Sequence, residues 1–397
     1  VNTSTATGND VYRLPNVNDV GSYWSCIWDA GGTDTISNEG SNVACTIDLR
    51  AAPLIGANAG GYVSYGTGII GGYTIANGVI IEAAIGGSSA DKLYGNSSGN
   101  TLSGGLGNDL IYVGTGTASD RVDGGSGVDG VSYAYAGSRV NVNLNLTTAQ
   151  ATGGSGTDTI LNIENLYGSA YGDTLRGNAS GNQLYGAAGN DLIYVGTGTA
   201  SDRVDGGSGV DGVSYAYAGS RVNVNLNLTT AQATGGSGTD TILNIENLYG
   251  SAYGDTLSGN ASGNQLYGAA GNDILNGMGG NDTLNGGAGL DTFVFNTALS
   301  AMGNKDTITD FNVTDDTIQL ENAIFTKLTT LGALATANFC ANATGIATDS
   351  NDFICYNTTT GALSYDADGS GAGASVAFAV LGTTVHPMLT AADFVIV

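Results

Sequence analysis

The sequence predicts an all-β solenoid, in which short extended segments alternate with tight turns and stack on one another. Three observations lead to this fold class. Glycine contributes 66 of the 397 residues and proline only 3, so the backbone must repeatedly adopt turns that few other residues allow. A nine-residue unit recurs in register, as in GAAGNDILN and GMGGNDTLN (residues 268–285). A longer block also recurs, because residues 107–191 return at 189–273 with a single difference.

The composition limits the classes of function. The hydrophobic fraction of 41% is close to that of a globular protein, so the chain can bury a core. The 35 acidic and 10 basic residues leave a net charge of −25, which argues against nucleic acid and anionic membranes as partners. No segment is long and apolar enough for a transmembrane helix. No signal peptide follows Val1, so we expect a processed or partial chain.

The N-terminal flank, residues 1–85, is expected to be β-rich with loops. It contains CIWDAGGTDTIS (26–37), a degenerate copy of the nine-residue unit with Asp34 and Ile36 at the acidic and apolar positions. The unit is therefore present before the regular repeats begin.

The repeats form two near-identical modules, residues 86–167 and 168–249, followed by a third run of nonapeptides at 250–294. The single difference between the duplicated blocks is Arg176 in place of Ser258. Isolated copies of the unit, GGSGTDTIL, start at residues 153 and 235. Apolar and polar residues alternate over RVNVNLNL (139–146), which predicts a strand with one solvated face.

The last region, residues 295–397, loses the glycine frame. We expect it to form a capping domain, because the end of a solenoid must be covered. LTTLGALATANF (328–339) is the best helix candidate in the chain, and FICYNTTTGALSYDADGSG (353–371) is typical of hairpins.

The nonapeptide pattern predicts which side chains face the interior and which stack on one another. Its apolar position eight is the middle of a short strand and faces the interior, while the neighbours of that position face outward. Two turns complete one coil, so residues 18 apart lie above one another. This spacing stacks Asp255 on Asp273 and Asp273 on Asp291, while insertions at 113–114 and 195–196 lengthen the step to twenty residues. Stacked carboxylates repel one another, so something must neutralise them.

A hard divalent cation would remove this repulsion and would also bind the carbonyls of the turns. Ca²⁺ accepts about six to eight mixed carboxylate and carbonyl oxygens, whereas Mg²⁺ demands a stricter octahedron. Zinc is disfavoured because the chain has 1 His and its 4 Cys are not spaced as CxxC. The candidate metal ligands are the position-six residues Asp91, Asp109, Asp120, Asp129, Asp158, Asp173, Asp191, Asp202, Asp211, Asp240, Asp255, Asp273, Asp282 and Asp291, with Asn100, Asn182 and Asn264 in the same place.

The nonapeptide resembles the calcium-binding repeat of RTX (repeats-in-toxin) proteins. IWDAGGTDTIS and IANGVIIEAAIGGSSADKLYGN (75–96) resemble the C-terminal region of serralysin-type secreted metalloproteases, and YAYAGSRVNVNLNLTTAQAT resembles modules of large RTX surface proteins. DTITDFNVTDDTIQL and the final DFVIV resemble type I-secreted calcium-binding proteins. The resemblance covers nearly the whole chain. It implies a right-handed parallel β-roll, bound calcium and export by a type I secretion machinery.

In the family that the sequence resembles, turn carbonyls complete each calcium site. One implied site combines Ala269, Gly271 and Asp273 with Gly286, Ala288 and Asp291, and a second combines Ser251, Tyr253 and Asp255 with Gly268, Ala270 and Asp273. Gly87, Gly104, Gly277 and Gly279 are further implied carbonyl positions. Asn264 lacks a charge, so the site that it shares with Asp282 should bind more weakly.

Catalytic motifs are not found. A serralysin-type protease needs HExxH, and the chain has only His386. Neither a nucleophile elbow nor a phosphate-binding loop ending in Lys-Ser or Lys-Thr is present, so we predict that the chain is not an enzyme. DADGSG (366–371) is either a further calcium site through Asp366 and Asp368 or a simple hairpin turn.

Cysteines and tyrosines leave two questions open. Cys26 with Cys45, and Cys340 with Cys355, could each close a small loop by a disulfide, although buried thiols are the alternative. Outward tyrosines at position nine (Tyr94, Tyr112, Tyr185, Tyr194 and Tyr267) could form a surface for self-assembly or for glycans, or could be ordinary surface aromatics.

These observations predict a secreted, non-enzymatic calcium-binding RTX protein of the extracellular space or cell surface. Its repelling aspartates would keep the chain expanded until calcium outside the cell binds and folds it. The leading hypothesis is a self-assembling structural component of a surface layer, filament or matrix. One alternative is the calcium-binding part of a larger serralysin-like protease, and another is an adhesin that binds glycan or partner cells.

Overall fold

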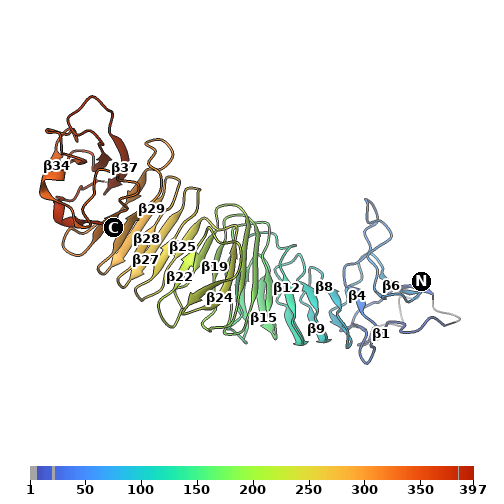
Figure 1. The fold of residues 1–397 in the computed structure, drawn as a ribbon. Helices are drawn as coiled ribbons and strands as arrows, with labels where there is room; N and C mark the ends of the chain where they lie inside the picture. Colours follow the sequence, from blue (N-terminus) through green and yellow to red (C-terminus); the bar gives the residue numbers. More distant parts are fainter. Residues whose placement is uncertain (1–6, 20–22, 383) are drawn as a thin grey trace. The chain divides into compact units, whose positions relative to one another are not determined.

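The computed structural model describes residues 7–19, 23–382 and 384–397, and Figure 1 shows that this part of the chain is built from β-strands. Two short 3-10 turns, η1 (Thr336–Asn338) and η2 (Ala391–Asp393), are the only helical elements in the described residues. The chain divides into two compact units. Unit 1 comprises Val1–Ile193 and Arg203–Gly209, and unit 2 comprises Tyr194–Asp202 and Val210–Val397.

Unit 1 contains two main sheets of mostly parallel strands, coloured blue to green in Figure 1. In spatial order, the first consists of β1 (Val11–Arg13), β3 (Thr35–Ser37), β7 (Ala83–Ile85), β9 (Thr101–Leu106), β11 (Arg121–Ser126), β15 (Gly156–Leu161) and β14 (Gln150–Gly153). The second includes β5 (Tyr65–Gly66), β4 (Cys45–Asp48), β8 (Lys92–Tyr94), β10 (Leu110–Tyr112), β12 (Gly130–Ser132), β16 (Asn165–Tyr167), β18 (Gln183–Ala188) and β20 (Arg203–Ser208). Two further parallel pairs are β2 (Trp24–Ile27) with β6 (Gly72–Ile75) and β13 (Asn141–Asn143) with β17 (Thr174–Arg176).

Unit 2 repeats this arrangement, and β19 (Leu192–Tyr194) lies where the chain passes into it. One sheet includes β21 (Gly212–Ser214), β25 (Asn247–Tyr249), β27 (Gln265–Ala270), β29 (Thr283–Ala288), β31 (Asp306–Ile308), β37 (Val376–Leu381), β36 (Ala362–Tyr365), β35 (Ile354–Asn357) and β34 (Phe339–Asn342). The other contains β22 (Asn223–Asn225), β26 (Thr256–Ser258), β28 (Ile274–Asn276), β30 (Thr292–Phe295), β32 (Thr317–Leu320), β38 (Phe394–Ile396) and β33 (Gly332–Ala333). A hairpin joins β23 (Gln232–Gly235) to β24 (Gly238–Leu243).

The strand register confirms the solenoid. Leu266 of β27 pairs with Leu284 of β29, and Leu257 of β26 pairs with Leu275 of β28, so each strand lies beside the strand one coil later. These four position-eight side chains are fully buried, at 0% exposure, as the alternation along a short strand requires. The predicted all-β class is therefore confirmed, and the architecture is that of a parallel β-roll.

The segment between the repeats forms a hairpin-like excursion. Val140, Val142 and Leu144 are buried while Asn141 and Asn145 are exposed, so the predicted strand with one solvated face is present. Leu146 departs from the alternation because it lies beyond the strand, and it is 41% exposed. Strand β13 begins a sheet here, because it pairs with β17 of the next nonapeptide run.

The helix predicted at 328–339 is wrong. The segment contains only the short strand β33 and the 3-10 turn η1. Gly332 has a φ of 99°, a conformation that interrupts a right-handed helix, and Leu334 is buried at the end of the roll instead of on a helix face. The hairpins expected after residue 353 are present, because β35, β36 and β37 pair in antiparallel fashion.

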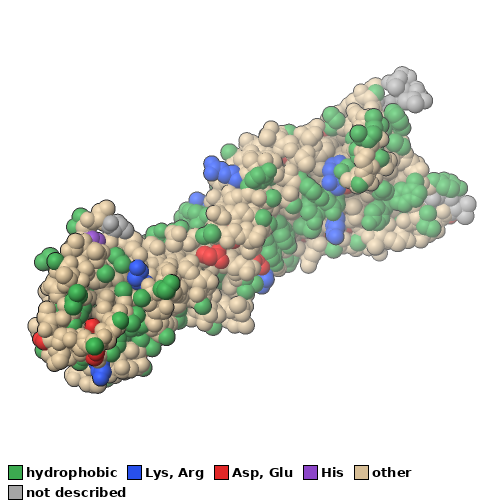
Figure 2. All heavy atoms as spheres, turned by 90° about the horizontal axis from the view of Figure 1, so that it is seen from above, with side chains coloured by type: hydrophobic (Ala, Val, Ile, Leu, Met, Phe, Trp, Pro, Cys, Tyr) green, Lys and Arg blue, Asp and Glu red, His purple; other side chains and the backbone are tan. Residues whose placement is uncertain are grey.

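The surface differs from the composition. Figure 2 shows few acidic side chains on the face in view, although the chain has 35 acidic residues. Many aspartates are buried instead, including Asp91, Asp109, Asp273 and Asp291. Among the described residues, no helix has the length and apolar character needed to cross a membrane.

Candidate metal centre

Glycine at position one of the nonapeptide creates a space lined by oxygen atoms. A Cβ at Gly268 would lie 2.2 Å from Asp273 Oδ2 and 2.5 Å from the carbonyl oxygen of Gly286. The equivalent Cβ at Gly104 would lie 2.2 Å from Asp109 Oδ2. Any side chain would fill this space, so only glycine keeps the carboxylate and carbonyl oxygens accessible to a third group.

The stacked position-six aspartates form a row along the roll, called the ladder below. One carboxylate oxygen of such an aspartate accepts a backbone N–H of the neighbouring coil. Asp273 Oδ1 accepts the backbone N–H of Asp255 at 2.6 Å, and Asp291 Oδ1 accepts that of Asp273 at 2.9 Å. In unit 1, Asp109 Oδ1 accepts the N–H of Asp91 at 2.8 Å. The structure therefore brings together residues that the 18-residue spacing predicts to be stacked.

The same contact recurs where the step is longer or where the ladder contains Asn. Asp129 accepts the N–H of Asp109 at 2.7 Å, across twenty residues. Three further stacked pairs show the same contact. The N–H groups of Asn100, Asp173 and Asn264 donate to the carboxylates of Asp120, Asp191 and Asp282, respectively. Asn182 and Asp211 are also buried at their repeat positions.

The second oxygen of several ladder aspartates lacks a protein donor. Buried Oδ2 atoms without a hydrogen-bond partner in the described residues belong to Asp109, Asp129, Asp273, Asp282 and Asp291. A buried polar atom without a partner costs about 1–3 kcal/mol, and more when it is charged. Five such atoms at equivalent positions are a set of oxygen donors of the kind that calcium binds. The residues present therefore fit a row of calcium ions.

The pKa values of these groups describe the metal-free turns. Burial is the main cause that raises the pKa of Asp109 and of Asp273 to about 7, and neighbouring carboxylates raise the pKa further. Burial also raises the pKa of Asp282 to about 6. A divalent cation beside each carboxylate would favour the ionised form and oppose these shifts.

The first aspartate of each run has different partners. Asp91 accepts N–H groups from Cys45 and Gly87, each at 2.6 Å. Asp173 and Asp255 likewise use both oxygens as acceptors from backbone N–H groups, those of Ser169 and Ser251 included. The site implied for Ser251, Tyr253 and Asp255 thus starts from a carboxylate that already has three donors, the Ser251 hydroxyl included, and its metal binding stays a prediction.

The isolated copies of the nonapeptide place their aspartates in a hydrogen-bonded interior. Asp158 Oδ1 accepts the N–H of Asp120 at 3.0 Å, and its Oδ2 accepts the Thr152 hydroxyl at 2.7 Å, with the Tyr133 hydroxyl at 3.5 Å. The duplicate shows the same contacts for Asp240 with Asp202, Thr234 and Tyr215. Asp158 and Asp240 therefore differ from ladder aspartates such as Asp109 and Asp273, because side-chain hydroxyls donate to their second carboxylate oxygen.

The carbonyls implied as ligands lie along the same turns. Ala288 O accepts the N–H of Gly271 at 2.8 Å, and Gly87 O accepts that of Leu106 at 2.9 Å. Ala269 and Ala270 lie opposite residues 287 and 288 in the ladder between β27 and β29. A carbonyl has a second lone pair, so these contacts are compatible with ligation, which stays a prediction for Gly277, Gly279 and Gly286 as well.

Sequence reasoning missed the continuation of both ladders into the C-terminal region. Asp306 Oδ1 accepts the N–H of Asp282 and Asp316 Oδ1 accepts that of Asp291, each at 3.1 Å. Burial and the neighbouring Asp282 carboxylate raise the pKa of Asp306 to about 8. The signal was present in the sequence, because Asp-Thr-Ile occurs at 306–308 and at 316–318 without the preceding glycines.

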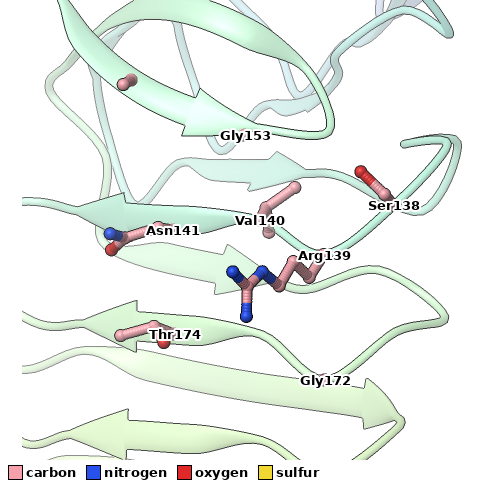
Figure 3. A pocket seen from close by; sticks show the side chains of 8 residues that line it. Ser138, Arg139, Val140, Asn141, Gly153, Gly172 and Thr174 are labelled. Carbon is pink, nitrogen blue, oxygen red and sulfur yellow. The ribbon is translucent and has the colours of Figure 1, made fainter.

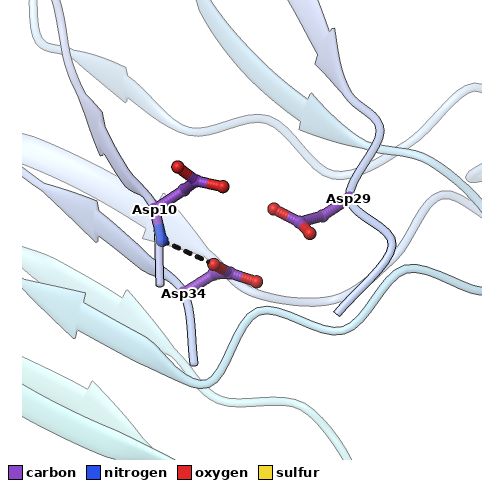
Figure 4. Close-up of side chains that lie close together, drawn as sticks. All are labelled: Asp10, Asp29 and Asp34. Atoms are coloured by element: carbon purple, nitrogen blue, oxygen red, sulfur yellow. Dashed lines mark hydrogen bonds between the residues drawn. The ribbon is translucent and has the colours of Figure 1, made fainter. Parts of the chain in front are cut away.

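A second acidic cluster lies in the N-terminal flank (Figure 4). The carboxylates of Asp10, Asp29 and Asp34 converge, with ligand oxygens within 4.8 Å of one another. Asp34 is fully buried, its Oδ1 accepts the N–H of Asp10 at 2.8 Å, and its Oδ2 has no partner among the described residues. Burial and the charges of Asp29 and Glu82 raise the pKa of Asp34. This cluster is a candidate cation site, of which the sequence indicated only Asp34.

The alternatives left open for Asp366 and Asp368 and for the cysteines can be placed in the structure, and calcium binding at the two aspartates stays a prediction. Asp366 and Asp368 lie in the turn between β36 and β37, where Asp368 accepts the N–H of Gly373 at 3.0 Å. Cys340 and Cys355 face each other on paired strands, with their sulfur atoms 3.2 Å apart, and both are thiols here. Cys26 and Cys45 are also thiols.

Comparison with known families agrees with this geometry. The family model described as "Peptidase M10 serralysin C terminal" matches residues 3–139 and 218–396. The model described as "RTX calcium-binding nonapeptide repeat (4 copies)" matches residues 167–199. Calcium, as several ions, is therefore the cofactor of this protein, and its relatives are secreted.

Individual relatives share shorter stretches. Serralysin of Proteus mirabilis is 36% identical over 110 residues, which is 25% of this chain and 21% of that protein. Serralysin of Photorhabdus laumondii subsp. laumondii is 44% identical over 75 residues, which is 19% of this chain and 14% of that protein. The matched stretches thus cover only a small part of these relatives. The crystal structure of the extracellular lipase LipA from Serratia marcescens aligns with 71% of this chain and 45% of that chain, at 16% identity and a TM-score of 0.17.

The recurring turns, the buried carboxylate oxygens and the family matches lead to one conclusion about identity. The RTX nonapeptide model matches a central stretch of the roll, and the serralysin model matches most of the chain on either side of it. This secreted calcium-binding protein belongs to the serralysin C-terminal family.

Proposed function

We propose that calcium folds this chain outside the cell and that the folded roll is a non-enzymatic structural component of an extracellular assembly. The observation that carries the calcium-dependent step is the set of buried, unpartnered Oδ2 atoms, such as those of Asp109, Asp129 and Asp273. Without a cation these turns contain repelling or protonated carboxylates, so metal binding and folding should be one process. Export by a type I secretion machinery would deliver the unfolded chain to calcium.

The structural role rests on how the chain has been lengthened. The duplicated block adds coils and metal turns, and the two copies differ at one position only. His386, the single histidine, has Nδ1 2.8 Å from the carbonyl oxygen of Leu381. The family matches concern the serralysin C-terminal region and the RTX repeats, neither of which is a protease domain. Each feature favours a scaffold over a catalyst.

The outward tyrosines are arranged for packing within the molecule. Tyr94 stacks on Tyr112 with ring centroids 4.4 Å apart, and Tyr249 stacks on Tyr267 at 4.8 Å. Because the ring faces cover each other, the rows present mainly ring edges and hydroxyl groups. Such an edge favours lateral contact between copies over stacking of a sugar ring on an exposed aromatic face.

Imaging tests the structural role. Electron microscopy of the purified chain with millimolar calcium should show regular lateral or end-to-end contacts, and sedimentation should show assemblies that vanish on chelation. A folded, calcium-loaded chain that stays monomeric at all concentrations would contradict the assembly, while leaving calcium-dependent folding to be tested by its spectrum.

A second candidate is the calcium-binding part of a larger serralysin-like protease. The family membership supports it, as does the small share of each serralysin that the matches cover. The coding sequence upstream of this chain tests it. An HExxH motif in the same reading frame, with proteolytic activity of the secreted product, would replace the structural role by this one.

A further inference from the structure

We propose that two equivalent clefts, each formed where a duplicated module meets the nonapeptide run that follows it, bind the carboxylate of an acidic sugar, with Arg139 as the anchor in the first cleft and Arg221 in the second. The inference is independent of the assembly proposed above, because it concerns a ligand of the single chain. It rests on a cavity that occurs twice, on an arginine in each cavity that forms no ion pair with the described residues, and on the polar groups that line the cavities.

The two cavities share most of their lining residues. The first has a volume of about 440 Å³ and is lined by Ser138, Arg139, Asn141 and Thr174 among others (Figure 3). The second, in unit 2, has a volume of about 470 Å³ and is lined by the duplicates Arg221, Asn223 and Thr256. Asp255 also lines it, and its two carboxylate oxygens accept the backbone N–H groups of Val222 and Ser251. In Figure 3 the guanidinium of Arg139 extends across the strands on the side where Asn141 and Thr174 lie. A ligand there would meet a cation, an amide and a hydroxyl together.

Close backbone contacts fix the cleft. The N–H of Val140 donates to Asp173 Oδ1 at 2.7 Å, which attaches the segment with Arg139 to the first turn of the next run. A Cβ at Gly154 would lie 2.2 Å from the carbonyl oxygen of Ser138, so the hairpin approaches this segment as only glycine permits. The position of Arg139 is therefore set by the same turn that begins the calcium ladder.

The arginines of the clefts differ from others in the chain. Arg121 pairs with Asp123 and Arg203 with Asp205, as surface ion pairs two residues apart. Neither Arg139 nor Arg221 forms an ion pair or a side-chain hydrogen bond within the described part of the chain. In a protein with a net charge of −25, an arginine without an acidic partner at the mouth of a cavity is a site for an external anion.

The walls indicate a sugar as the carrier of that anion. Hydroxyl and amide groups suit a ligand with many hydroxyls, and the volume lies in the range of ordinary ligand sites. Arginine binds a carboxylate through two parallel hydrogen bonds, which lysine does not provide. A uronic acid combines such hydroxyls with one carboxylate on each sugar ring, so a short oligouronate is the ligand that these walls fit.

The test uses the whole calcium-loaded chain and the trimer of galacturonic acid, titrated by calorimetry. The fully methyl-esterified trimer is the matched ligand, since it has the same shape without the charges. We expect two trimers per chain for the acid and weaker binding by about tenfold or more for the ester. Equal binding of acid and ester, or no binding of the acid, would overturn the proposal without recourse to any variant.

Variants then locate the site. Arg139→Gln or Arg221→Gln alone should reduce the stoichiometry to one trimer per chain, and the double variant should abolish specific binding. Arg121→Gln combined with Arg203→Gln removes the same charge from the same modules and should leave the affinity within about twofold, because exposed ion pairs contribute little. Equal losses in both double variants would show a general charge effect and overturn the site. Loss of self-association in place of trimer binding would show that the clefts hold a second copy of the chain.

Discussion

Asp273 and Asp158 occupy the same position of the nonapeptide, yet their carboxylates have different partners. Asp273 Oδ1 accepts the backbone N–H of Asp255 in the preceding coil, and its Oδ2 is buried without a donor among the described residues. Asp158 also accepts a backbone N–H, but the Thr152 hydroxyl occupies its Oδ2 at 2.7 Å. The difference arises because a hairpin, and not another glycine turn, folds over Asp158. We therefore expect the segment stacked on the motif, and not the motif alone, to determine whether a turn binds metal.

The largest expected effect is that of calcium removal. The ladder turns contain several buried carboxylates without donors, whereas the two hairpin turns are satisfied by protein groups alone. Chelation should therefore collapse the far-UV β-signal of the whole roll, because the coils depend on one another, and excess calcium should restore it. A spectrum that does not change after complete calcium depletion would contradict the proposed role of the ladder.

Acid should partly replace calcium. An aspartate in the unfolded chain has a pKa near 3.8, and burial raises the pKa of Asp109, Asp120 and Asp273 in the metal-free roll to about 7. The folded form thus binds more protons between these values, so its stability is fully present below about pH 4 and is lost as the pH rises through 7. Calcium-depleted chain should show more β-signal at pH 5 than at pH 8.

The calcium-loaded chain should show the opposite trend, because the ions bind ionised carboxylates. Its calcium affinity should fall as the pH is lowered from 8 to 5. Isothermal titration at the two pH values checks this expectation, and an affinity that is independent of pH would exclude the buried aspartates as ligands.

Single substitutions sharpen the comparison between the two kinds of turn. Asp273→Asn should lower the number of tightly bound calcium ions, because Asp273 lies between two stacked neighbours. Asp158→Asn should leave the calcium count unchanged while destabilising the fold. Metal analysis of the dialysed variants, with urea unfolding in calcium, separates the two effects. A reduced calcium count for Asp158→Asn would place that residue among the ligands after all.

The smallest effect concerns the hydroxyl that satisfies Asp158. Thr152→Val removes the donor at 2.7 Å, the shortest contact of this buried carboxylate oxygen, whereas the Tyr133 hydroxyl lies 3.5 Å away. We expect a loss of about 1–3 kcal/mol in the free energy of unfolding, at constant calcium stoichiometry. The matched variant Thr174→Val changes a strand residue outside this network and should be close to neutral by the same urea measurement.

The sequence was sufficient for those features that depend on local spacing. The glycine and aspartate periods predicted the stacked coils, the buried position-eight side chains and the pairing of Asp255 with Asp273. Features formed by distant segments were not predictable in this way. Asp10 and Asp29 join Asp34 only in the folded flank, and Thr152 reaches Asp158 only through a hairpin.

The C-terminal region shows the other limit. Asp306 and Asp316 extend the ladders although the glycine repeat has ended. The stacking of coils thus continues beyond the last residue at which the nine-residue period can be recognised in the sequence. The incorrect prediction of a helix at 328–339 has a related cause. A run of small and apolar residues there follows Gly332 and packs one side chain, Leu334, against the end of the roll.

The space beside the glycine of each turn determines how such a chain can change over time. A substitution at Gly268 would push a carbon into the position where oxygens of two successive coils meet, so isolated changes there are penalised. A duplicated block, by contrast, contains both the glycine of each turn and the aspartate that lies against it, so the two still fit together. Growth by whole-block copying therefore preserves every junction at once, and a family of rolls can vary in length far more readily than in the composition of its turns.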